Sequence, residues 1–153
     1  MGNPVKFCTS ILVLAALAVI LLTSTGEARQ FSKCSLAKSL LAQGFKRADL
    51  QNWVCLVQNE SRMKTDAMNY VNSDGSWDWG LFQINDRYWC DPRDKRKSSN
   101  GCKVKCSDLA SEDITAAGKC AKLIYNIHGF QAWVAWINKC QYGSLPDLSD
   151  CDL

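Results

Sequence analysis

The sequence is poor in several features that would indicate other classes of protein. Its formal net charge is only +3 over 153 residues, which is too small to argue for a nucleic-acid partner. It has one histidine, His128, and only one close-spaced cysteine pair, "CKVKC" at 102–106, so no metal or other cofactor is expected. It contains no internal repeat and no low-complexity segment. This composition and length predict a single domain with one hydrophobic core.

The longest hydrophobic run is also short. "ILVLAALAVILL" at 11–22 follows Lys6, and the small residues of "TSTGEA" at 23–28 come after it. Twelve apolar residues are too few to span a bilayer, so a secretory signal peptide over 1–28 is favoured over a membrane anchor. We therefore expect a secreted, extracellular domain over 29–153, without a membrane anchor.

Cysteine, by contrast, is plentiful. Removal of the signal peptide removes Cys8 and leaves eight cysteines. An even number in a secreted chain of this size predicts four disulfides. Eight cysteines allow 105 connectivities, and their number alone does not select one.

The apolar spacing predicts an α+β fold. Four segments have helical spacing: 33–43, 49–60 with Asp49 as N-cap, 113–126, and 131–140 as a buried helix. "SDGS" at 73–76 is typical of a hairpin turn, and we expect a strand in the "WDWGLFQIN" that follows. The polar segment 91–101 is expected to be a loop. Helices at both ends with a small sheet between them are typical of α+β proteins.

Glu60 lies at the end of an apolar helical stripe. Leu50, Trp53 and Val57 share its face of the predicted helix. Burial there would raise the pKa of the carboxyl group, so that it could stay protonated near neutral pH and donate a proton. The alternative is a glutamate that points into solvent at a frayed helix end.

Asp78 is placed differently. It alternates with Trp77 and Trp79, and the neutral polar residues Asn72, Ser76, Gln83 and Asn85 are near it in the sequence. Hydrogen bonds from such groups favour an ionised carboxylate. When one acid lies in apolar surroundings and the other in polar surroundings, their pKa values differ, as acid–base catalysis requires. The alternative, a turn-capping aspartate, suits Asp66 and Asp74 better.

These residues lie in motifs that resemble the animal-type (c-type) lysozyme and α-lactalbumin family. The similarity covers the whole mature chain, in "NWVCLVQNES" (52–61), "SDGSWDWGLFQIN" (73–85), "DRYWC" (86–90), "SEDIT" (111–115) and "AWVAW" (132–136). All eight cysteines match the positions of that family. The resemblance implies a helical lobe and a small antiparallel sheet lobe with a cleft between them. Lysozyme is itself the usual example of paired catalytic carboxylates.

The resemblance also implies a role for each site residue. Glu60 matches the general acid and Asp78 the second carboxylate. Trp133 matches the tryptophan that packs against the acid and excludes water from it. The residues that match the substrate-binding cleft are Asn72, Gln83, Asn85, Tyr88, Trp89, Ala132 and Trp133. The implied reaction is retaining hydrolysis of the β-1,4 bond between N-acetylmuramic acid and N-acetylglucosamine in bacterial peptidoglycan. The implied protein is a monomeric, bacteriolytic enzyme.

Four disulfide pairs follow from the same resemblance: Cys34–Cys151, Cys55–Cys140, Cys90–Cys106 and Cys102–Cys120. The sequence also departs from the family pattern. Tyr88 replaces the commoner tryptophan of the cleft wall, and "YNIH" at 125–128 is unlike the family's usual outer-subsite segment and one residue shorter. We expect His128 to be a surface residue without a catalytic task. Ser111, Ala116 and Ala117 stand where calcium-binding members need aspartates, so no calcium requirement is expected.

Two other functions are compatible with this sequence. The first is a non-catalytic glycan-binding or regulatory protein on the same scaffold, although such proteins typically lose one of the two carboxylates. The second is a cationic antimicrobial protein that acts on membranes through "RDKRKSS" at 93–99. A charged run in a loop is more often simply solvated.

Overall fold

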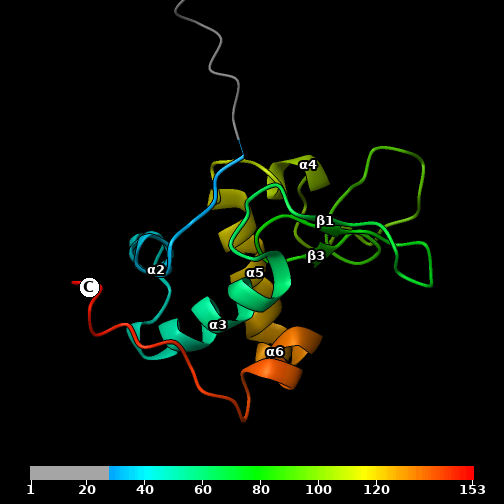
Figure 1. Cartoon of the computed structure of the whole chain (residues 1–153). Coiled ribbons are helices and arrows are strands. Elements are labelled where there is room, and N and C mark those ends of the chain that lie inside the picture. The colour runs from blue at the N-terminus through cyan, green and yellow to red at the C-terminus, as the bar shows by residue number, and fades with distance from the viewer. Residues whose placement is uncertain (1–27) are drawn as a thin grey trace, which may run out of the picture.

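The computed structural model describes residues 28–153. The expected signal peptide, 1–28, therefore lies outside the described residues except for its last position. The α-helices are α2 (Lys33–Ala42), α3 (Leu50–Ser61), α4 (Cys106–Leu109), α5 (Thr115–His128) and α6 (Val134–Lys139). Two 3₁₀ helices, η1 (Arg47–Asp49) and η2 (Gly129–Ala132), precede α3 and α6. A small antiparallel sheet lies to one side of the helices (Figure 1), which confirms the α+β prediction.

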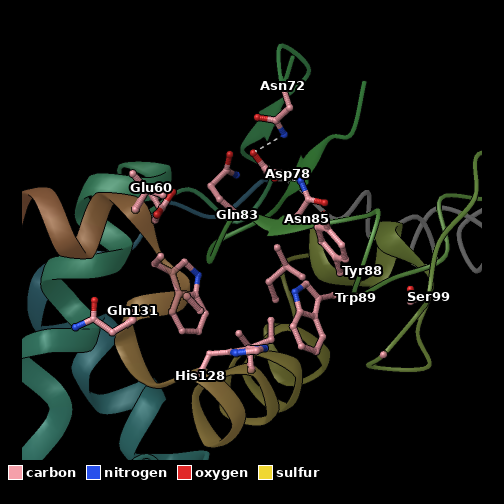
Figure 2. Close-up of a pocket in the computed structure, with 16 residues that line it drawn as sticks. Glu60, Asn72, Asp78, Gln83, Asn85, Tyr88, Trp89, Ser99, His128 and Gln131 are labelled. Atoms are coloured by element: carbon pink, nitrogen blue, oxygen red, sulfur yellow. Dashed lines mark hydrogen bonds between the residues drawn. The ribbon is translucent and has the colours of Figure 1, made fainter. Parts of the chain in front are cut away.

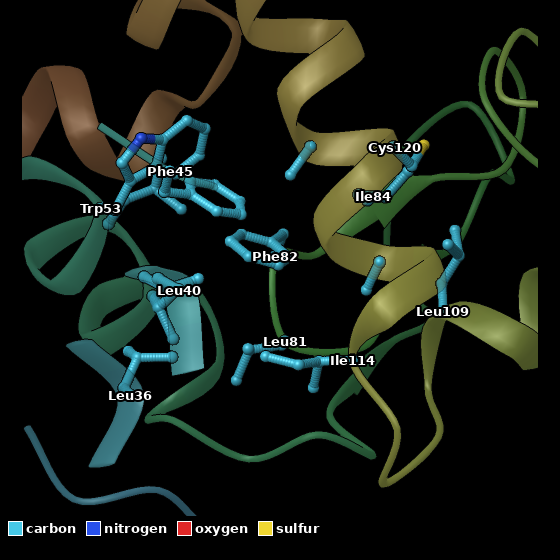
Figure 3. Packing of buried hydrophobic residues seen from close by; sticks show 14 of the residues in the cluster. Leu36, Leu40, Phe45, Trp53, Leu81, Phe82, Ile84, Leu109, Ile114 and Cys120 are labelled. Atoms are coloured by element: carbon cyan, nitrogen blue, oxygen red, sulfur yellow. The ribbon is translucent and has the colours of Figure 1, made fainter. Parts of the chain in front are cut away.

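Helix α3 packs against both α2 and α6. Trp53, on its buried face, is only 2% exposed. The Trp53 ring lies 4.8 Å from Phe130 and 5.0 Å from Phe45, measured between ring centroids, both edge-to-face. Phe82, which comes from the sheet region, packs against the same indole at 5.9 Å (Figure 3). A shared aromatic core therefore connects the helices to the sheet, and truncating Trp53 to alanine would cost about 3–5 kcal/mol of stability.

The sheet has three strands of two residues each. β1 (Met68–Asn69) pairs with β2 (Asp78–Trp79), which pairs with β3 (Ile84–Asn85). The segment "WDWGLFQIN", in which a strand was expected, therefore holds two short strands, because the chain turns between β2 and β3. Gly80 has a φ of +71°, and a side chain there would collide with the Leu109 carbonyl. Positive φ and this close backbone approach explain why glycine begins the turn.

The structure modifies two predictions about the helices. Asp49 is the N-cap residue of α3, as predicted, but its side chain makes no capping hydrogen bond. The expected buried helix at 131–140 is instead split into η2 and α6, and α6 has no buried residue. Its first residue, Val134, is 67% exposed and lines an open cleft, so an apolar sequence did not mean burial here.

The structure joins the cysteines in the four pairs that the family resemblance implies. Cys34–Cys151 connects α2 to the C-terminus, which lies near that helix in Figure 1. Cys55–Cys140 connects α3 to the end of α6. Cys90–Cys106 and Cys102–Cys120 hold the loop region against α4 and α5. Among the described residues, none of the helices combines the length and the hydropathy needed to cross a membrane.

Candidate active site

A cleft of about 950 Å³ runs between the helices and the sheet. Its walls come from the end of α3, from β2 and β3, and from the segment that joins α5 to α6 (Figure 2). The structure brings together all nine residues that were predicted for the site: Glu60, Asn72, Asp78, Gln83, Asn85, Tyr88, Trp89, Ala132 and Trp133.

Glu60 lies in the last turn of α3. The helix ends immediately after Ser61, where Arg62 adopts a left-handed conformation with a φ of +53°. Burial raises the pKa of Glu60 from 4.5 to about 7, a backbone hydrogen bond from Ala135 opposes this, and the charge of Asp78 raises it further. Glu60 can therefore hold a proton close to neutral pH and release it to a bound molecule.

Asp78 is held by three amide groups. Asn72 and Asn69 donate to its Oδ2 at 2.9 and 3.0 Å, and Asn85 donates to its Oδ1 at 2.8 Å. The register of the sheet explains two of these bonds, because Asn69 and Asn85 are the direct cross-strand partners of Asp78. The three donors fix the orientation of the carboxylate.

Asn69 was not among the residues predicted for the site. It is nine residues from Asp78, and no local pattern distinguishes it from other polar loop residues. The only usable signal was its distance from the "SDGS" turn, which places it opposite Asp78 once the hairpin register is known.

Gln83 and Ser76 were expected to surround Asp78, but they act less directly. Gln83 lines the cleft, and its side-chain amide donates to the backbone carbonyls of Ala67 and Gly80 at 3.0 and 2.8 Å. Ser76 is buried and its hydroxyl accepts from Asn85 at 2.7 Å. Both residues therefore organise the backbone and the amides near Asp78 rather than binding its carboxylate.

Trp133 forms part of the cleft wall and is only 5% exposed. Its indole Nε1 donates to the Phe82 carbonyl at 2.9 Å, and its ring packs edge-to-face on Trp53 at 5.4 Å. Because both interactions fix the ring, the apolar surface that it presents to the cleft has a defined orientation.

Tyr88 and Trp89 form the opposite wall. Tyr88 is 53% exposed, so part of its side chain is open to a ligand. Behind Trp89 lies Gly101, where a side chain would approach the indole to 2.9 Å. His128 is exposed, as expected for a surface residue, but it also lines the cleft, with its ring 5.9 Å from that of Trp89 (Figure 2).

Possible metal ligands are few. Within residues 28–153, the only close group of potential ligands is Cys34, Asp150 and Cys151. The two sulfur atoms of this group form a disulfide and cannot act as thiolate ligands.

A cleft that holds one carboxyl group with a pKa raised to about 7 and one amide-bound carboxylate is typical of a glycoside hydrolase. Residues 29–151 match the C-type lysozyme/alpha-lactalbumin family, and the chain belongs to this family.

Individual relatives agree with this assignment. The chain is 50% identical over 123 residues to the lysozyme of Galleria mellonella, covering 80% of this chain and all of that protein. It is 51% identical over 136 residues to the lysozyme of Bombyx mori, covering 88% and 95% of the two chains. Among solved structures, canine milk lysozyme superimposes with a TM-score of 0.76 at 36% identity, covering 82% of this chain and all of that one.

Proposed function

We propose that this chain is a secreted lysozyme that cleaves the β-1,4 bond between N-acetylmuramic acid and N-acetylglucosamine in bacterial peptidoglycan. The observation that carries the proposal is the contrast between the two carboxyl groups in one cleft. The pKa of Glu60 is raised to about 7, while Asp78 receives three amide hydrogen bonds. Two acids in such different surroundings can perform opposite tasks at one pH.

In the first step, Glu60 donates its proton to the glycosidic oxygen as the bond to C1 breaks. Asp78, on the opposite side of that carbon, attacks C1 or stabilises its positive charge. In the second step, the ionised Glu60 takes a proton from water, which adds to C1 and releases Asp78. The configuration at C1 is retained, which requires the two carboxyl groups to be roughly 5–5.5 Å apart.

The cleft walls supply binding energy for the polymer. Sugar rings have apolar faces that stack on aromatic side chains, and their hydroxyl and acetamido groups need hydrogen-bond partners. Tyr88, Trp89 and Trp133 offer such surfaces, and Ala132 and Gln83 line the same space. The residues of one chain line the cleft, and we propose that the enzyme acts as a monomer.

Four disulfides support an extracellular location, because such bonds persist in oxidising compartments. The segment 1–28 would direct secretion and be removed. A membrane-disrupting function is less well supported, because Arg93 and Arg96 of the basic run pair with neighbouring aspartates.

Lysis of a Gram-positive cell-wall suspension tests the proposal. Glu60→Gln keeps the size of the side chain but cannot donate the proton, so nearly all lytic activity should be lost; Asp78→Asn should also be severely impaired. Glu112→Gln, which removes an exposed carboxyl outside the cleft, is the control and should remain active. A folded Glu60→Gln or Asp78→Asn protein with near-wild-type rates would refute these roles. The anomeric configuration of the first product, read by NMR, tests retention.

A further inference from the structure

A second acidic residue of the sheet region, Asp86, is more deeply buried than either cleft carboxylate. It is 2% exposed. Its Oδ1 accepts from the backbone N–H of Trp77, and its Oδ2 accepts from the indole Nε1 of Trp79, both at 3.1 Å. Its own backbone N–H donates to the Trp77 carbonyl at 2.9 Å. Asp86 therefore binds the two residues that flank Asp78 in the sequence.

The counter-ion of Asp86 comes from the basic run 93–99. Arg96 Nη1 lies 2.7 Å from Asp86 Oδ2, and the guanidinium carbon lies 4.0 Å above the ring of Trp77. Asp94 binds the same guanidinium. The side chain of Arg96 is 27% exposed, whereas that of Arg93 in the same run is 65% exposed. One cation of a run that looked solvated is thus packed against the sheet.

These contacts are connected to Asp78 through two short paths. Trp77 and Trp79 hold the backbone of Asp78 from both sides. Asn85, which donates to Asp78 at 2.8 Å, immediately precedes Asp86. Because neighbouring residues in a strand point to opposite faces, Asp86 and its partners can hold the backbone around Asp78 without projecting into the cleft. A fixed Asp86 therefore holds both Asp78 and its amide donor Asn85 in position.

We propose that the Asp86–Arg96 ion pair is a positioning device that holds Asp78 and Asn85 in their catalytic geometry. The inference rests on the proposed role of Asp78. A buried ion pair is weak evidence for added stability, but the loss of one partner leaves an uncompensated buried charge. Without Arg96, the Asp86 carboxylate should turn towards water or another hydrogen-bond donor, and the Trp77–Trp79 segment should move with it. Neither Asp86 nor Arg96 lines the cleft, so their effect is on orientation.

Steady-state kinetics on a soluble peptidoglycan fragment of defined length test this. Arg96→Gln, Arg96→Lys and Asp86→Asn are compared with Arg93→Gln, which removes one positive charge from the exposed part of the same run. A misplaced catalytic group reduces turnover steeply, so we expect kcat to fall about 10- to 100-fold in Arg96→Gln, with KM changed less than about 2-fold. Arg96→Lys keeps the positive charge but loses the planar guanidinium group, which can donate two parallel hydrogen bonds and stack on the Trp77 ring. This variant should therefore recover only part of kcat. The Asp86→Asn/Arg96→Gln double variant should lose little more than either single variant.

A second measurement does not depend on hydrolysis. The side-chain NH₂ groups of Asn69, Asn72 and Asn85 donate to Asp78, and their ¹⁵N-correlated NMR signals report its position. We expect those of Asn69 and Asn85 to shift and broaden in Arg96→Gln but not in Arg93→Gln. Unchanged signals, or a kcat within 2-fold of wild type despite a lower Tm, would overturn the proposal and leave Arg96 only a stabilising role for its loop. If the wild-type chain hydrolysed no peptidoglycan, the proposed function would fail, while the amide signals would still decide the positioning role.

Discussion

Glu60→Gln should inactivate the protein and yet stabilise it in alkaline solution. The carboxyl group of Glu60 has a pKa of about 7 in the folded protein, against 4.5 for an ordinary glutamate, chiefly because burial disfavours its charged form. Glutamine has nearly the same shape and no charge at any pH. The substitution therefore removes the cost of burying a carboxylate while leaving the packing of the site almost unchanged.

The sign of the effect follows from proton binding. Below pH 4.5, the folded and the unfolded chain both hold the proton, and burial of a charge costs nothing. Between pH 4.5 and about 7, only the folded chain holds it, so the contribution of Glu60 to the free energy of unfolding falls as the pH rises. Above pH 7 the whole contribution is lost, and it amounts to ~3 kcal/mol for this difference in pKa.

The assay is thermal unfolding of wild type and Glu60→Gln from pH 4 to pH 9. The Tm of the variant relative to wild type should rise through the window from pH 4.5 to 7 and then level off, by roughly 10 °C for a domain of this size. Acid-induced losses at exposed aspartates occur in both proteins and cancel in the difference. Glu112→Gln is the control for the loss of one carboxyl. A Tm difference that does not vary with pH would refute the assignment of Glu60 as a desolvated acid.

Three further predictions concern the chain outside the cleft. Asn59, in the sequon "NES" at 59–61, should remain largely unglycosylated. Its Nδ2 donates to the Cys55 carbonyl at 2.8 Å and lies 3.9 Å from the Cys140 sulfur. A glycan-sized mass excess in the intact secreted protein, absent from Asn59→Gln, would contradict this prediction. Calcium in place of chelator should change the Tm by less than about 2 °C. A bound ion would stabilise the folded state by mass action, so a rise of many degrees would show that the segment 106–120 binds calcium. The mature protein should begin at Arg29 and contain no free thiol, which N-terminal sequencing and thiol titration of the denatured, unreduced chain can check; one reactive sulfhydryl would break the four-disulfide scheme.

Local sequence was sufficient for Glu60. The residues that bury its face of α3 recur every three or four positions, and a helix of any length presents them on one side. The core around Trp53 could be anticipated for the same reason. The number of disulfides followed from counting, whereas their pairing depended on the family resemblance.

Local sequence was insufficient for the surroundings of Asp78. The partners of a strand are chosen by the register of the whole hairpin, and this register places Asn69 opposite Asp78 while Gln83 bonds to the backbone. Likewise, "AWVAW" is apolar whether it faces the core or an open cleft, so only the fold could show that Trp133 is buried and Val134 is exposed.

The basic run shows the same division most clearly. Its sequence determined that a loop would carry several positive charges, and composition favours solvent for all of them. The tertiary structure selected Arg96 to pack on Trp77 and to neutralise Asp86. The physical reason is that periodicity reports the average environment of a segment, whereas the pairing of one buried charge with another depends on which distant residues the completed fold brings within a few ångströms of each other.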